Sequence, residues 1–164
     1  MRSPEGQPLS ARVQWDGTRD RSAFASMHDA LRFREDIGGD AAIMRYNADL
    51  AKWAAHYLSS FWGTTNFVSD EFFTSMSDVV LPSANDTALN LVVDALLLEH
   101  GIMTSGVGSC SNPGDTNTTG ILPGQAGCHL FRLSAQVYLE KADFVKLGHL
   151  VVELLRRFDP SFQG

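Results

Sequence analysis

The chain has 164 residues, about the length of one domain, and its 44% hydrophobic and 20% charged residues are ordinary for a soluble globular protein. Its net charge of −6 leaves no basic stripe to neutralise phosphates, so we expect no nucleic-acid partner. The apolar run 89–98 is interrupted by Asn90 and Asp94 and is shorter than the roughly 20 residues of a membrane helix, so we expect no membrane partner. The first residues of the sequence contain no apolar stretch of the kind found in secretory signals, so we expect no secretory signal and a cytoplasmic location.

The first third of the chain predicts two helices. Residues 1–12 have the composition of a tail, and residues 13–15 predict a short strand. Ser22 is a candidate cap for a helix over 22–37, which Gly38-Gly39 would end. A longer helix is predicted over 40–61. Its apolar residues recur with a period of 3.6 and predict a buried stripe of Ile43, Tyr46, Leu50, Trp53 or Ala54, Tyr57 and Phe61.

The middle of the chain predicts a strand, a helix and a second short strand. Residues 76–81 predict a strand that Pro82 stops. Asn85 or Asp86 is expected to cap a helix through Glu99, which Gly101 ends, and Ile102-Met103 predict a short strand. The inward residues of that helix are predicted to be Leu89, Val92, Val93, Leu96 and Leu97.

The last third predicts a loop, a strand and a helix. Residues 104–127 form a polar segment whose length is typical of a functional or disordered loop. A strand is predicted over 128–134 and a helix over 142–158, with Phe144, Leu147, Leu150, Val151, Leu154 and Leu155 on its core side. This order of elements predicts an α+β fold: a small antiparallel sheet with helices packed on one face, preceded by two long helices.

Two short segments hold the candidate binding residues. In the first, Gly17 allows a close backbone approach and Thr18 supplies a hydroxyl, a combination suited to a phosphate, although for the pair taken alone a structural turn is the better explanation. In the second, Arg132 lies in a mostly apolar predicted strand, and its planar guanidinium suits a carboxylate. The alternatives are an arginine that reaches solvent and one paired with an internal acid.

These segments, Trp15-Asp16-Gly17-Thr18-Arg19-Asp20 and Phe131-Arg132-Leu133-Ser134-Ala135-Gln136-Val137-Tyr138, resemble the carboxyl-terminal portion of class V aminotransferase-like enzymes of fold type I, which use pyridoxal phosphate (PLP). The isopenicillin N epimerase-like branch looks closest, with cysteine desulfurases as relatives. Leu139 departs from the pattern, because asparagine is common there.

The resemblance implies a role for each segment. Gly17 and Thr18 would contact the PLP phosphate of a neighbouring subunit, and Arg132 would bind the α-carboxylate of an amino-acid-like substrate. Residues 1–37 would be the end of the large cofactor domain, 38–62 a connecting helix and 63–164 the small α+β domain. Epimerisation, transamination and Cβ–S lysis remain open as reactions, and a homodimer is expected when the enzyme is complete.

The lysines limit what this chain does alone. Its three lysines, Lys52, Lys141 and Lys146, occupy charged helical positions, whereas PLP enzymes hold their cofactor on a lysine that in this family lies upstream. We therefore predict no catalytic residue in this chain, and an N-terminal half or partner chain that carries the lysine. The alternatives are a non-catalytic dimerisation module derived from the same fold and an unrelated α+β binding domain.

No metal site is predicted, because the five histidines show no metal-ligand spacing. The two cysteines, Cys110 and Cys128, are too few for a disulfide framework. They flank one polar loop, and a bridge across that loop is the alternative to two free thiols.

Overall fold

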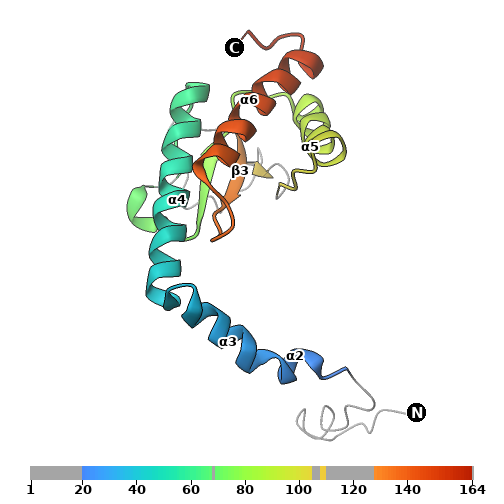
Figure 1. Ribbon diagram of the computed structural model, residues 1–164. Helices are drawn as coiled ribbons and strands as arrows, with labels where there is room; N and C mark the ends of the chain where they lie inside the picture. Colours follow the sequence, from blue (N-terminus) through green and yellow to red (C-terminus); the bar gives the residue numbers. More distant parts are fainter. Residues whose placement is uncertain (1–19, 68, 105–107, 110–127, 164) are drawn as a thin grey trace, which may run out of the picture. The chain divides into compact units, whose positions relative to one another are not determined.

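The computed structural model describes residues 20–67, 69–104, 108–109 and 128–163 (Figure 1). Gly17, Thr18 and the strand predicted over 13–15 therefore lie outside the described residues. The chain forms two compact units, one that ends at Asp40 and one that begins at Ala41, and each is described by itself.

Within the described residues of the first unit, two helices occupy the range where the sequence predicted one. Helix α2 spans Ser22–Ala25 and helix α3 spans Met27–Asp36. Ser26 separates them, and its hydroxyl donates to the Ala23 carbonyl at 3.3 Å. Serine side chains compete with the backbone for carbonyl groups in this way, which explains the interruption. Neither helix contains a buried residue, so their apolar side chains are exposed.

Helix α4 spans Gly39–Trp62. The predicted break before it is confirmed, because Gly38 and Gly39 have φ angles of 115° and 79°, which side chains with a Cβ rarely adopt. The predicted buried stripe was wrong in part. Tyr46 and Phe61 are 43% and 40% exposed. The buried residues of α4 are mostly small or polar: Ile43, Asn47, Leu50, Ala51, Ala54, Ala55, Leu58, Ser59 and Trp62.

A three-stranded antiparallel sheet follows, so the chain is α+β, as predicted. Strand β1, Met76–Val80, pairs along its whole length with β3, His129–Ser134. Strand β2, Gly108–Ser109, pairs with the start of β3, which gives the order β1-β3-β2. A short 3₁₀ helix, η1, covers Asp70–Phe72 before the sheet.

Two local predictions beside the sheet were wrong. Ile102-Met103 form no strand, because the N–H groups of Gly101 and Ile102 bond to the carbonyls of Leu97 and Leu96 and so close the end of helix α5. Strand β2 instead lies within the segment predicted as a loop. Its Gly-Ser sequence has weak strand propensity, so it is the pairing with β3 that makes it a strand.

Helices α5, Asp86–His100, and α6, Lys141–Phe158, complete the second unit. All six predicted core residues of α6 are buried. In α5, Leu89, Val92 and Leu96 are buried as predicted, whereas Leu97 is 45% exposed. Helix α6 lies between α4 and α5 (Figure 1).

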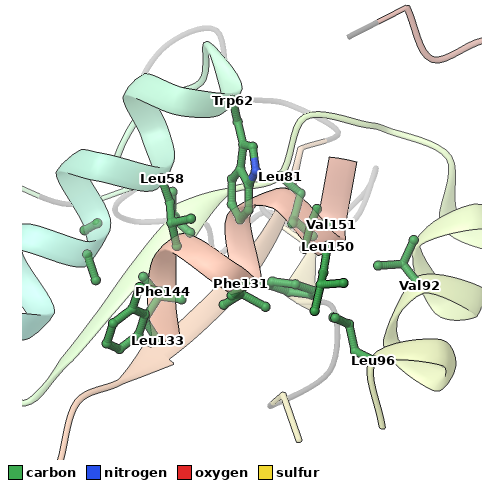
Figure 2. Packing of buried hydrophobic residues seen from close by; sticks show 14 of the residues in the cluster. Leu58, Trp62, Leu81, Val92, Leu96, Phe131, Leu133, Phe144, Leu150 and Val151 are labelled. Atoms are coloured by element: carbon green, nitrogen blue, oxygen red, sulfur yellow. The ribbon is translucent and has the colours of Figure 1, made fainter. Parts of the chain in front are cut away.

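The core lies between these helices and one face of the sheet. Figure 2 shows Phe131 of β3 at its centre, with Leu58 and Trp62 of α4 to one side and Val92 and Leu96 of α5 to the other. Side chains of β3 alternate between buried and less buried positions, as expected for a strand with one covered face. The predicted packing of helices on one face is consistent with this pattern.

Two further features concern the sequence predictions. Cys128, just before β3, is disulfide-bonded, and the sequence contains one other cysteine, Cys110, which is not among the described residues. In the part of the chain that the structure describes, no helix combines the length and the apolar character needed to cross a membrane.

Candidate functional site

Arg132 lies on the face of the sheet that the helices leave uncovered. Its neighbours in β3, Phe131 and Leu133, are buried in the core, and the pleat of the strand turns Arg132 to the opposite side, where it is exposed. Burying an unpaired guanidinium would be costly, and this position avoids that cost. The predicted carboxylate-binding residue is therefore accessible to a ligand.

Asp78 of β1 is the cross-strand neighbour of Arg132, and the two Cα atoms are register partners. Burial raises the pKa of the half-buried Asp78 carboxyl, while the positive charge of Arg132 acts in the opposite direction. Among the described residues, however, no ion pair within 4.0 Å joins them. Of the predicted pairing between Arg132 and an internal acid, only a longer-range electrostatic interaction with Asp78 is present. The guanidinium therefore keeps its hydrogen-bonding capacity for a ligand.

Arg132 also lines a groove of about 670 Å³. Four segments form this groove: the residues after α5, strand β3, the turn that follows β3, and the first two turns of α6. The volume lies within the range of about 300–1,000 Å³ typical of small-molecule sites. The candidate site is therefore a groove at the end of β3 that continues onto α6.

Among the described residues, two cations and one carboxylate line this groove. Lys146, on α6, is the second cation, and Asp143, one turn earlier, is the carboxylate. Asp143 is already engaged, because its Oδ2 atom accepts a hydrogen bond of 2.8 Å from the Glu140 N–H in the capping box of α6. The groove therefore has an excess of positive charge on its wall.

A buried hydroxyl also belongs to the lining of the groove. The Oγ1 atom of Thr104 is buried and has no hydrogen-bond partner among the residues that the structure describes, and Thr104 lines the groove. A buried polar atom without a partner costs about 1–3 kcal/mol. A ligand oxygen or a bound water would relieve that cost.

Two hydrogen bonds fix the turn between β3 and α6, one within the turn and one from helix α4. The Leu139 N–H donates to the Gln136 carbonyl at 2.9 Å, which closes the turn. The hydroxyl of Tyr46, on α4, donates to the Leu139 carbonyl at 2.8 Å. Because Leu139 and the exposed Tyr138 both line the groove, this contact fixes the position of its wall relative to α4.

The described residues do not provide a covalent site for PLP. Lys52 forms an ion pair of 2.9 Å with Asp70, and Lys141 lies 5.0 Å from the centre of the Trp53 ring. Lys146 is exposed on α6. None of these lysines has the apolar, desolvated surroundings that activate a lysine amine for Schiff-base chemistry.

No protein-family model matches this chain, and a comparison with curated proteins finds no match.

Sequence reasoning found Arg132 but missed Lys146 and Thr104. Lys146 had been assigned to an exposed helical position, which is correct, but nothing in its spacing placed it beside Arg132. One signal was available: only residues 135–140 separate β3 from α6, so the first turns of the helix must lie near the end of the strand. The position of Thr104 follows from the end of α5 and had no comparable signal.

Proposed function

We propose that this chain is the carboxyl-terminal portion of a PLP-dependent enzyme of the class V aminotransferase-like type, and that Arg132 binds the α-carboxylate of an amino-acid-like substrate. The observation that carries the proposal is the exposure of Arg132 at the groove without a carboxylate within ion-pair distance among the described residues. A guanidinium in that setting can donate two parallel hydrogen bonds to a carboxylate.

In this proposal the chain binds and orients the substrate and does not perform the chemistry. Arg132 would fix the carboxylate end of the substrate, and the apolar wall of the groove would exclude water from one side of it. Phe131 and Leu133 anchor the strand in the core on both sides of Arg132, so the guanidinium projects from a rigid element. The lysine that holds PLP, and the residues that contact its ring, would come from another polypeptide segment.

The first test isolates the protein from its native cells with an antibody against α6. We expect a species heavier than 17.9 kDa, or a complex with a second polypeptide, that contains PLP in stoichiometric amount and a lysine-bearing segment absent from this sequence. A species of 17.9 kDa that contains neither a partner nor PLP would refute the enzyme proposal and favour the interaction module.

The second test measures Arg132 directly in that native enzyme. Hydrogen bonds to charged groups are worth about 1.5–3 kcal/mol, so Arg132→Gln should lower kcat/KM for the substrate by 10-fold or more. Arg45→Gln is the matched control, because Arg45 is an exposed arginine of α4 that does not line the groove. Equal kcat/KM values for the two variants would contradict the role of Arg132.

A further inference from the structure

Lys146 gives the groove a second cationic position. Its side chain is exposed on α6 and lines the same groove as Arg132. Among the described residues, no carboxylate oxygen lies within 4.0 Å of its Nζ atom. A cleft whose wall has an excess of one charge attracts ligands of the opposite charge. Two cations that line one groove, one from β3 and one from α6, therefore favour a ligand with two anionic groups.

The surface between the polar groups is apolar. Ile102, Leu133 and Leu147 line the groove together with the two cations, and so does Thr104, whose Oγ1 atom is buried. A ligand that suits these walls has polar ends and a hydrocarbon middle. Its oxygen atoms would satisfy the Thr104 hydroxyl, which has no partner in the described part of the chain.

We propose that the groove binds a ligand with two anionic groups separated by an apolar spacer, one group at Arg132 and the other at Lys146. The assignment of the first group rests on the proposed function, and that of the second rests on Lys146 alone. The substrate class is therefore an amino acid, or an amino-acid-like compound, whose side chain ends in a carboxylate. The volume of the groove, about 670 Å³, leaves room for a chain longer than that of the smallest dicarboxylates.

The experiment titrates the full chain of 164 residues with simple carboxylates and follows binding by NMR. The probes are glutarate, pimelate and azelate, each compared with the monocarboxylate of the same number of carbons. We expect at least one dicarboxylate to bind 10-fold or more tightly than its matched monocarboxylate. The spacer length with the largest advantage would report the separation of the two cations.

Two pairs of variants assign the two ends. Lys146→Gln should abolish the advantage of the dicarboxylate and leave monocarboxylate binding unchanged. Lys141→Gln is its control, because Lys141 is on the same helix, stacks on Trp53 and does not line the groove. Arg132→Gln should weaken both ligand types, and Arg45→Gln should weaken neither.

The outcomes separate this proposal from the proposed function. If dicarboxylates and monocarboxylates bind equally and Arg132→Gln weakens both, the role of Lys146 is wrong and that of Arg132 stands. If the advantage depends on Lys146 but the native protein contains no PLP, the two-anion groove stands and the enzyme proposal fails. If inorganic phosphate competes as well as the best dicarboxylate, one anion bridges both cations and the two-ended ligand is wrong. Absence of binding by every carboxylate would also overturn the proposal.

Discussion

Gly148 lies where α6 packs against α4, and replacing it with alanine tests that packing. A Cβ atom at this position would lie 2.9 Å from Leu58 Cδ2 and 3.3 Å from Phe61 Cδ1. Phe61 is 40% exposed and can move aside toward solvent, whereas Leu58 is fully buried and any shift of its side chain must be accommodated within the core. The substitution therefore forces an overpacked contact in the core.

Two effects of opposite sign set the magnitude. Alanine is better than glycine in a helix interior by about 1 kcal/mol. Overpacking a well-filled core costs typically 1–3 kcal/mol. We expect Gly148→Ala to lower the free energy of unfolding by about 1 kcal/mol, measured by urea denaturation with a two-state fit. In a domain of this size the melting temperature would fall by roughly 2–4 °C.

Measuring Gly148→Ala in a Leu58→Val variant tests whether the contact with Leu58 causes the destabilisation. Leu58→Val removes the Cδ2 atom that the new methyl group meets, at a cost of about 1 kcal/mol in the original sequence. In the Leu58→Val background, Gly148→Ala should stabilise the fold, because only the gain in helix propensity remains. If Gly148→Ala stabilises the original protein as much as it stabilises the Leu58→Val variant, the two helices do not approach closely at this point and the reasoning is refuted.

Two further predictions concern the contact between the start of α5 and the end of α6. Asn85→Ala should cost about 1–2 kcal/mol in urea denaturation, because the Asn85 Oδ1 atom caps α5 by accepting from the Ala88 N–H at 3.2 Å; an unchanged midpoint would count against the cap. Hydrogen bonds from Ser161 and Ser83 lower the pKa of Asp159 below its ordinary value of 3.8, so its carboxylate stabilises the fold above that pH and loses the effect as the pH falls. Asp159→Asn should therefore lower stability most near neutral pH, and the difference from the original protein should shrink below about pH 3.8 in urea titrations; a difference that is constant with pH would contradict this origin.

The sequence predicted α6 better than α4 for a physical reason. Every large apolar residue in the predicted stripe of α6 faces the core, so periodicity alone located that face. In α4 small residues such as Ala51, Ala54 and Ala55 share the core face with a few large ones, because the helix packs closely against its neighbours. Tyr46 and Phe61 lie beside that face. The prediction assigned the bulkiest side chains to the core and therefore placed these two residues there wrongly.

The candidate site was predictable only where one residue carried the signal. Arg132 stood out because a guanidinium is unusual among the apolar residues of a strand. Lys146 and Thr104 are ordinary at their own positions, and they become a site only because a short turn and the end of α5 bring them to one groove. Such proximity depends on tertiary structure, which local spacing does not encode.

The aromatic row on α4 has a consequence for the helix pair. Trp53 and Tyr57 stack at 5.1 Å, and Tyr57 and Phe61 stack at 5.7 Å. Lys141 of α6 lies over the first ring and His149 of α6 contacts the last. Both contacts join residues with the same offset between the helices, so α4 and α6 run in the same direction.

Parallel neighbouring helices gain nothing from their dipoles, which point the same way, so side-chain packing must hold them together. Lys141 and His149 contact the two ends of the row, and a slip of one helix past the other by a single turn, about 5.4 Å, would move one of them onto Tyr57 and take the other off the row. The contacts at both ends of the row therefore set the position of α6 along the axis of α4. Through that position they also set the height at which the first turns of α6 meet the end of β3.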